Sequence, residues 1–261
     1  MFRSEMTWQE VDALSRTTVV VIPFGAMEQH GRHLPLETDA RIGQEIAARL
    51  DVACCKRLLV LPVQWLGLST HHMDFAGTIS ATVDTYLALA ADIVGSIAHA
   101  GFQKILVLNS HGGNVSALDV VLTKLRTSFA GTRIVLVTYW NAAADQLRGL
   151  RESAEGGMGH ACELETSLML AIKPDVVHKG SLEPDGRWST SRFLAKDMLV
   201  GGSANVSRAF ADITAYGGVG DPRTASAEKG EQFFDVIIGR LRQLVDELAS
   251  GKIDEFRDAG S

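Results

Sequence analysis

The sequence predicts an α/β fold with three layers, in which helices cover both faces of a mostly parallel sheet. Short apolar runs such as TTVVVIP and KILVL have the length of one strand and lack the alternation of a half-exposed strand. Between them lie longer stretches with apolar residues three or four positions apart, which is helical spacing. Strands that alternate with helices in this way form parallel sheets covered on both sides.

The expected elements follow from these patterns in chain order. Strands are predicted at Thr17–Pro23, Leu58–Pro62, Lys104–Leu108 and Arg133–Tyr139. Helices are predicted at Asp39–Leu50, Thr82–His99, Val115–Ser128, Cys162–Ile172 and about Ala225–Leu248, with a short one within Asn141–Glu155. Glycines mark turns from Lys173 to Asp221, where no regular pattern is present. Such long irregular stretches usually carry function or subunit contacts. No repeat or linker interrupts residues 1–261, so we expect one domain.

The composition narrows the class of partner. The chain has 261 residues, 46% of them hydrophobic, so it is long enough to bury a core without staples. A net charge of −6 without any Lys/Arg run argues against nucleic acid and favours a small-molecule substrate. No apolar run reaches about 18 residues and the start is polar, so no membrane span and no signal peptide are expected. Three cysteines make no disulfide framework, which points to the cytoplasm.

The stretch Phe24–Asp39 joins a predicted buried strand to a helix and concentrates polar side chains. Glu28 and His30 are two residues apart, so in an extended chain they point the same way and can reach one metal centre. Asp39 has two interpretations: it caps the following helix, which Asp favours at that position, or it is a further ligand.

The segment NSHGGN, residues 109–114, directly follows the strand KILVL. A histidine at the carboxyl end of a parallel strand, followed by two glycines and a helix, occupies a typical site position. A phosphate-binding glycine loop and a simple tight turn are alternatives, but the spacing matches neither a P-loop nor a dinucleotide motif. We therefore predict that His111 is a metal ligand.

The segment GHACELETS, residues 159–167, enters the next helix. His160 and Glu163 are three residues apart, so both are expected to face one way, while Glu165 points elsewhere. An alternative for both acids is stabilisation by the helix dipole. The apolar run LMLAI follows, so the helix is buried and its acids need partners such as a metal.

These segments together supply two imidazoles and three carboxylates, from Glu28, His30, Asp39, His111 and Glu163. Such a mixed set suits Zn²⁺, Mn²⁺ or Fe²⁺ and exceeds what one open catalytic zinc requires. Two divalent metal ions that share a bridging carboxylate account for the number of ligands. The expected chemistry is attack of a metal-bound hydroxide on a carbonyl or amidine carbon.

The motifs GAMEQHGRHLPLETD, NSHGGN, HACELETSLMLAIKPD and the late GVGDPRTASAEKGE resemble the creatininase (creatinine amidohydrolase) family over roughly residues 6–245. The resemblance implies one α/β/α domain with a dinuclear metal centre at the carboxyl ends of the strands. It also implies a homo-oligomer, often a hexamer, and a metal-dependent hydrolase of carbon–nitrogen bonds other than peptide bonds. The substrate would be a small amide, a cyclic amide or a formamide.

Carried over by motif, Glu28, Asp39 and His111 would bind one metal, and His30, Asp39 and a further carboxylate the other. Creatininase takes that carboxylate from its version of NSHGGN, where this chain has Gly113. Glu163 is the expected replacement, so that Glu163→Gln should lose one metal of two while Glu165→Gln keeps both.

His160 matches the catalytic histidine of the family and is assigned as the general acid for the leaving nitrogen. Trp140 matches an aromatic residue of the creatinine pocket, whereas the second pocket tryptophan corresponds to Gly156.

The loop STHHMDFAGTIS resembles the substrate loop of the family, with His71, His72 and Asp74 as expected pocket residues. Relatives with similar motifs include formamide deformylases, a peptide-trimming protein and keto-inositol hydrolases. Hydrolysis of a cyclic keto-sugar or keto-inositol therefore stays an alternative, as does a non-catalytic ligand-binding role.

Overall fold

The computed structural model describes residues 3–256 and contains a four-stranded parallel sheet with the order β2-β1-β3-β4. The strands are β1 (Val19–Phe24), β2 (Leu59–Val60), β3 (Lys104–Asn109) and β4 (Arg133–Thr138). Each predicted strand is present, with ends that differ by up to two residues. Every residue of β1 is buried, because both faces of the strand are covered by helices. The predicted three-layer α/β fold is confirmed.

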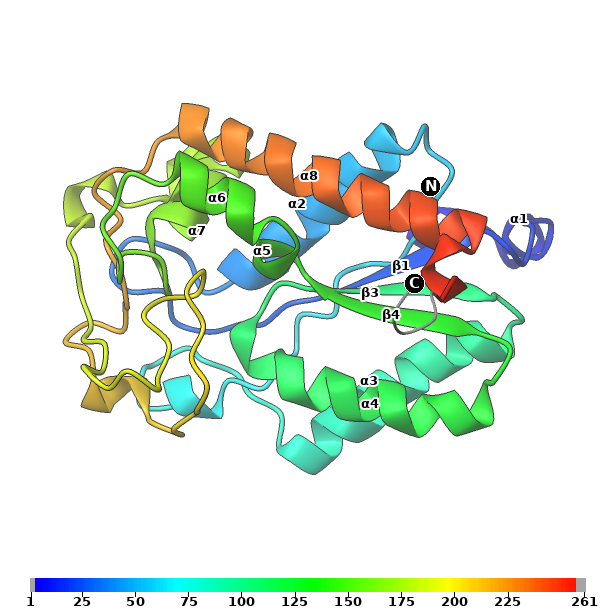
Figure 1. Ribbon diagram of the computed structural model, residues 1–261, viewed down its shortest axis with the longest axis horizontal. Coiled ribbons are helices and arrows are strands. Elements are labelled where there is room, and N and C mark those ends of the chain that lie inside the picture. The colour runs from blue at the N-terminus through cyan, green and yellow to red at the C-terminus, as the bar shows by residue number, and fades with distance from the viewer. Residues whose placement is uncertain (1–2, 257–261) are drawn as a thin grey trace.

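Helices form the two outer layers (Figure 1). One layer contains α3 (Val83–His99) and α4 (Val115–Ser128). The other contains α2 (Thr38–Ala53), α5 (Tyr139–Ala142), α6 (Ala144–Leu150), α7 (Glu163–Ile172) and α8 (Ala227–Ser250). A short helix α1 (Trp8–Asp12) precedes the sheet. The predicted helix within Asn141–Glu155 is thus two short helices that end at Leu150.

The start of α2 decides between the two interpretations of Asp39. The N-cap position is occupied by Glu37, whose side chain makes no capping hydrogen bond, and the helix begins at Thr38. Asp39 therefore lies in the first turn, and its buried side chain does not cap the helix. The carboxylate is directed to other partners, which are described below.

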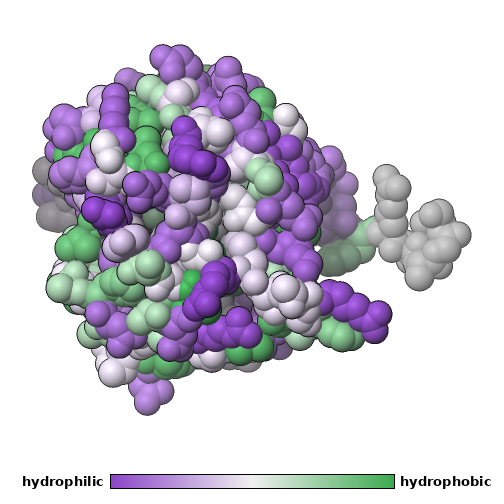
Figure 2. Space-filling view, turned by 90° about the vertical axis from the view of Figure 1, so that its left-hand side faces the viewer, coloured by the Kyte–Doolittle hydropathy of each residue, from purple (hydrophilic) through white to green (hydrophobic). Residues whose placement is uncertain are grey.

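The strands all run toward one end of the molecule, where the irregular segments gather (Figure 1). Between Lys173 and Asp221 the chain forms only short 3₁₀ turns, as predicted, including η6 (Phe210–Asp212). On the surface of this end, hydrophilic and hydrophobic residues are intermixed (Figure 2).

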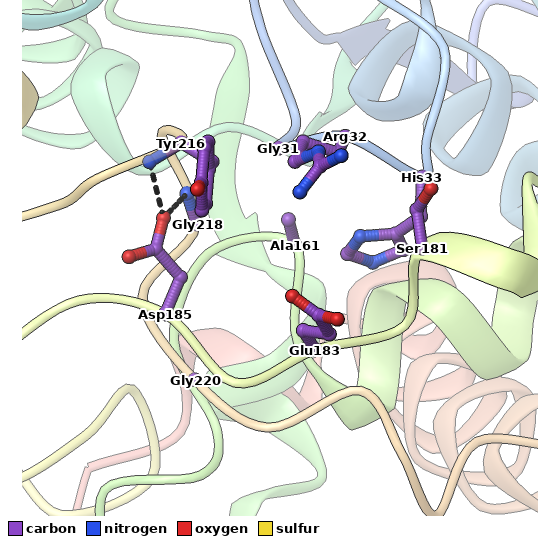
Figure 3. Close-up of a pocket in the computed structure, with 10 residues that line it drawn as sticks. All are labelled: Gly31, Arg32, His33, Ala161, Ser181, Glu183, Asp185, Tyr216, Gly218 and Gly220. Carbon is purple, nitrogen blue, oxygen red and sulfur yellow. Dashed lines mark hydrogen bonds between the residues drawn. The ribbon is translucent and has the colours of Figure 1, made fainter.

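Asp185 fixes one loop of this irregular region. Its carboxylate accepts hydrogen bonds from the backbone N–H groups of Ala215 (2.9 Å), Tyr216 (2.7 Å) and Gly218 (3.2 Å). Figure 3 shows this carboxylate beside the loop, at the edge of a cavity that is only large enough for about one water molecule. The loop from Thr214 to Gly218 is therefore held in one conformation. Within residues 3–256, none of the helices has both the length and the apolar character needed to cross a membrane.

Candidate metal centre

Three chain segments meet at the carboxyl ends of the strands. Glu28 and His30 follow β1, His111 follows β3, and Asp39 lies in the first turn of α2. Strands β1 and β3 are paired neighbours in register Phe24↔Asn109, so the segments that follow them emerge side by side. All four side chains are at most 3% exposed. The structure thus brings together four of the five predicted ligands.

Asp39 is the centre of this group. Its Oδ1 lies 3.2 Å from Nε2 of His30, and its Oδ2 lies 3.0 Å from Nδ1 of His111. The same nitrogen of His111 is 3.3 Å from Oε1 of Glu28. Asp39 therefore faces a different imidazole with each of its oxygens.

The other nitrogen of each imidazole is held by the backbone. His111 Nε2 lies 2.9 Å from the carbonyl oxygen of Leu68, and His30 Nδ1 lies 3.1 Å from that of Glu28. A carbonyl only accepts, so each of these nitrogens carries a proton, and in the neutral ring the nitrogen that faces the carboxylates can offer its lone pair to a cation. Metal-binding histidines typically have such backbone partners, which fix the ring and its tautomer.

The donor set fits a cation. Both oxygens of Glu28 and Oδ2 of Asp39 are buried and have no partner in hydrogen-bonding geometry. Buried carboxylate oxygens without a partner are costly, and a divalent cation would satisfy them. Two donors at tetrahedral positions around one zinc are roughly 3.4 Å apart, close to the separations found between these side chains. Overlapping groups that could hold an ion are Glu28/His30/Asp39, Glu28/His71/His111, Glu28/His72/His160 and His30/His160/Glu165.

Glu163 lies outside this cluster, contrary to the prediction. Its carboxylate accepts hydrogen bonds from the backbone N–H groups of Glu152 (3.0 Å) and Ser153 (2.8 Å) and from Nζ of Lys229 (2.7 Å). Burial alone would raise the pKa of Glu163, but the bonds from Lys229 and Ser153 outweigh it and lower the pKa. This side chain joins α7 to α8 and to the preceding loop.

Glu165 takes the place predicted for Glu163. It is 4% exposed, lines the same cavity as Glu28 and Asp39, and lies close enough to His30 and His160 to share an ion with them. Its Oε2 accepts a hydrogen bond of 2.6 Å from the N–H of Ala161. The carboxylate that is missing at Gly113 is therefore available from Glu165.

The position at which α7 begins explains why Glu165, and not Glu163, faces the cavity. The three-residue rule holds only inside a helix, and α7 begins at Glu163, after His160. Between them Ala161 has a φ of 54°, so the chain turns sharply and His160 and Glu163 do not share a face. Glu165 at the third helical position points back into the cavity. The sequence signal was the pair of acids itself; choosing between them needed the position at which the helix begins.

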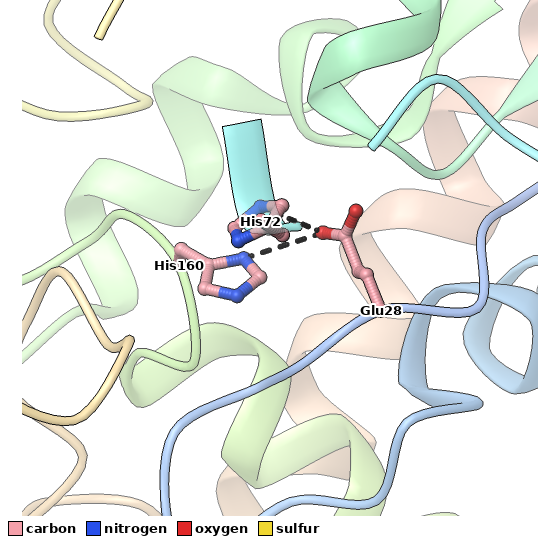
Figure 4. Close-up of side chains that lie close together, drawn as sticks. All are labelled: Glu28, His72 and His160. Atoms are coloured by element: carbon pink, nitrogen blue, oxygen red, sulfur yellow. Dashed lines mark ion pairs between the residues drawn. The ribbon is translucent and has the colours of Figure 1, made fainter. Parts of the chain in front are cut away.

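His160 presents one nitrogen to the cluster (Figure 4). Its Nε2 lies 2.7 Å from the carbonyl oxygen of Gln29 and so carries the proton, while Nδ1 lies 3.7 Å from Oε1 of Glu28. Burial and the nearby imidazoles of His30 and His72 hold the pKa of His160 well below its usual value. The ring is neutral at pH 7 and can accept a proton at Nδ1.

The acids and imidazoles of the cluster shift one another's pKa values. Burial disfavours the charged form of His30, but attraction by Asp39, Glu165 and Glu28 raises its pKa to about 9. Burial raises the pKa of Glu165 to about 7 despite His30. Burial alone would raise the pKa of Glu28, but His111 and His72 lower it well below the usual value. Such shifts mark a desolvated polar site of the kind used for catalysis.

The cluster forms one wall of a cavity of about 300 Å³. Trp140, His71 and His72 line it, as predicted, whereas Asp74 is exposed and is absent from the lining. The other walls are mostly apolar and come from residues that the sequence reading did not single out: Trp188, Met198, Phe210, Ile213 and Val219. Their segments are irregular, so no periodicity marked them.

Trp188 occupies the space beside Gly156, where the second pocket tryptophan was expected to be missing. Its indole N–H donates a hydrogen bond of 2.7 Å to the carbonyl oxygen of Gly156. A Cβ built on Gly156 would lie 3.2 Å from Cδ1 of Trp188, so the glycine leaves room for the ring. The cavity therefore has two indoles, Trp140 from α5 and Trp188 from the irregular region between Lys173 and Asp221.

Gly113 cannot carry a side chain in this backbone. A Cβ there would lie 2.1 Å from the carbonyl oxygen of Leu68 and 2.5 Å from Nε2 of His111. It would enter the hydrogen bond that orients His111. The loop is thus built for glycine, and a carboxylate from this position is excluded by the same geometry.

Comparisons with known proteins identify the family of the chain. The profile of the creatininase family, described as creatinine amidohydrolase, matches residues 4–245. A mycofactocin precursor peptide peptidase of Mycobacterium ulcerans is 33% identical over 82% of this chain and 79% of its own length. The creatinine amidohydrolase of Pseudomonas putida is 28% identical over 95% of this chain and 96% of its own.

Solved structures extend the similarity to the fold. A Bacteroides fragilis protein, provisionally assigned as a creatinine amidohydrolase, has a TM-score of 0.79 at 27% identity and covers 95% of this chain and 96% of its own. A manganese form of creatininase and a Zn–Zn form of a creatininase mutant have TM-scores of 0.76 and 0.75 at 27% and 26% identity, each covering 94% of this chain and 97% of its own. The chain therefore belongs to the creatininase family, as its motifs predicted, and is a metal-dependent hydrolase of carbon–nitrogen bonds.

Proposed function

We propose that this hydrolase cleaves the carbon–nitrogen bond of a small neutral amide, cyclic amide or formamide that has a flat or apolar body. The observation that carries the proposal is the position of the carboxylate–imidazole cluster at the wall of a 300 Å³ cavity whose other walls are aromatic and aliphatic. Pockets of about this size and character hold small ligands, with a few polar groups that fix their orientation. The amide would meet the cluster while its body lies against the indoles of Trp140 and Trp188.

Two divalent cations, Zn²⁺, Mn²⁺ or Fe²⁺, fit the donors best. Glu28, Asp39 and His111 would hold one ion, and His30, Asp39 and Glu165 the other, with Asp39 shared. This assignment rests on the two oxygens of Asp39, which face His30 and His111 separately. When bound, the cations would activate the attacking water and stabilise negative charge on the amide oxygen.

His160 would move the proton. Nδ1 is unprotonated and faces the cluster, so it can take a proton from the attacking water and deliver it to the leaving nitrogen. This second step is the general-acid role expected from the sequence. The lowered pKa of His160 keeps the ring neutral, so its Nδ1 is free at neutral pH.

The lining favours an uncharged substrate. Among the lining residues of this cavity there is no Lys or Arg, and the titratable groups are the carboxylates and imidazoles of the cluster and its neighbours. An anionic substrate would find no counter-charge beyond the cations themselves. The Pseudomonas putida relative acts, by its name, on creatinine, which is small and planar, and the Mycobacterium ulcerans relative on a precursor peptide.

The test uses the Mn²⁺-loaded full-length protein with creatinine, formanilide and a short uncharged peptide as substrates. We expect hydrolysis of at least one of the two small amides, loss of that activity in His160→Ala, and loss of bound metal in Glu28→Ala and His111→Ala. A matched control is His99→Ala, which changes a histidine in the last turn of α3. Full metal occupancy in both ligand variants, or cleavage of the peptide alone, would overturn the proposal.

A further inference from the structure

Gln29 stands between two residues of the metal cluster, and its side chain has no role in the chemistry described above. Its side chain is buried, at 5% exposure, and the amide is held from both ends. Oε1 accepts a hydrogen bond of 2.9 Å from the N–H of Gly31, and Nε2 donates one of 2.9 Å to the carbonyl oxygen of Gly217. An N–H only donates and a carbonyl only accepts, so these two partners define which end of the amide is oxygen.

This orientation determines the tautomer of His72. Nε2 of Gln29 also lies 2.6 Å from Nδ1 of His72, and since Nε2 is the donor, Nδ1 must be the acceptor. The proton of the neutral ring is then on its other nitrogen, Nε2, which lies 3.2 Å from Oε1 of Glu28. The nitrogen of His72 nearest to Glu28 therefore carries a proton and has no lone pair for a cation, although this N–H is not aligned for a hydrogen bond to the carboxylate.

The backbone of the same residue sets the opposite tautomer in His160. The carbonyl oxygen of Gln29 accepts the Nε2 proton of His160, which leaves Nδ1 unprotonated on the side of Glu28. The two hydrogens of the Gln29 amide are already used, so its 3.2 Å approach to Nε2 of His160 is a contact between two N–H groups. His72 and His160 both face the carboxylate of Glu28 (Figure 4). Gln29 thus makes His72 present its protonated nitrogen to that carboxylate and His160 its unprotonated one.

The acceptor of Gln29 is itself fixed. Gly217 lies in the loop that Asp185 holds through the N–H groups of its neighbours Tyr216 and Gly218. Its φ is +94°, and a Cβ there would lie 1.8 Å from Oε1 of Gln29, so only glycine permits the approach. Hydrogen bonds thus connect Asp185, in the irregular region, through the loop at Gly217 to Gln29 beside the cluster.

We propose that Gln29 is a positioning residue that keeps the proton of His72 on Nε2, the nitrogen nearest to Glu28, so that His72 stays outside the metal ligand set, and that makes His160 a proton acceptor. The inference concerns the same site as the proposed function, but it is a statement about proton positions and can be tested without turnover.

The test compares the wild type with Gln29→Glu, both as full-length, Zn²⁺-loaded protein with ¹⁵N-labelled histidine. Two-bond ¹H–¹⁵N spectra distinguish the tautomers, and the signals of His72 and His160 are assigned by their loss in His72→Phe and His160→Phe. A carboxylate at position 29 cannot donate to His72, so its proton should move from Nε2 to Nδ1. His160, bonded to the backbone, should keep its Nε2 proton in Gln29→Glu.

A second readout is the affinity for Mn²⁺, expected to fall about 10–100-fold in Gln29→Glu, as for other changes next to metal ligands. The control is Gln44→Glu, the same substitution at a residue whose Oε1 accepts from the N–H of Val63 and can continue to do so. It should leave both readouts unchanged. An Nδ1 proton on His72 in the wild type, which needs no variant to fold, overturns the inference, as does an unchanged tautomer in Gln29→Glu. Absence of amide hydrolysis with these tautomers present would refute the proposed function alone.

Discussion

The two glutamates of α7 allow a direct exchange experiment. Glu165→Gln removes a carboxylate that faces His30 and His160, and it is expected to lose one metal ion of two. Glu163→Gln is expected to keep both ions and to lose stability, because this carboxylate is bound to Lys229 and to backbone N–H groups. This is the reverse of the outcome that helical spacing predicts from the sequence.

The cost of Glu163→Gln follows from its partners. Glu163 is fully buried and pairs with Lys229, whose side chain is 7% exposed, at 2.7 Å. Breaking a buried ion pair by removing one partner costs about 3–5 kcal/mol. Glu152 remains 3.1 Å from Nζ of Lys229 and is largely exposed, so we expect the lower figure, about 3 kcal/mol. At about 2–4 °C per kcal/mol for a chain of this size, Tm should fall by about 6–12 °C.

The assay has two arms. Elemental analysis after Mn²⁺ loading and dialysis gives the ions per chain, and thermal unfolding in the presence of a chelator gives the stability without the contribution of bound metal. We expect one ion per chain and a nearly unchanged chelated Tm for Glu165→Gln, and two ions with the lower Tm for Glu163→Gln. Equal metal content in the two variants, or metal loss in Glu163→Gln alone, would refute the reasoning.

Two further predictions concern pH and the glycine loop. The folded pKa of Glu163 is lowered from 4.5, so its contribution to stability is fully present above about pH 4.5 and is lost as the pH falls through the folded value. The difference in unfolding free energy between wild type and Glu163→Gln, from urea titrations with a chelator, should therefore be constant near neutral pH and shrink in acid; a constant difference at all pH values would contradict this. Gly113→Ala places a Cβ 2.5 Å from Nε2 of His111 and should weaken Mn²⁺ binding about 10–100-fold in a metal titration. Gly112→Ala, whose Cβ meets nothing within 4 Å, should bind as the wild type does, and equal affinities in the two variants would show that the loop tolerates the side chain.

Much of the fold was predictable because its signals are local. The strand KILVL is apolar on both faces, and α4 was predicted with its observed ends, because helical periodicity is written in the chain itself. His111 was found in the same way, since a polar residue directly after a buried parallel strand must lie at the carboxyl edge of the sheet. Glu28 and His30 followed from the neighbouring strand.

The irregular region could not be read in this way. Trp188 and Phe210 reach the cavity from segments without periodicity, and their positions depend on turns stabilised by distant partners such as Asp185. Gly156 suggested that the pocket lacks its second tryptophan, but Trp188, which is 32 positions further along the chain, lies beside it. A contact of this kind leaves no local signature.

The layers of the fold were predictable because strand and helix periodicity is local, and the family because its motifs are continuous in the chain. The same motifs predicted that Glu28, His30, Asp39, His111 and His160 lie together, which is where the structure places them. Only the tertiary structure decided that Glu165 and not Glu163 joins them, since the choice depends on where α7 begins and on Lys229, 66 residues away, which binds the other carboxylate. The proton positions on His72 and His160 were likewise decided by contacts with Gln29 across the fold.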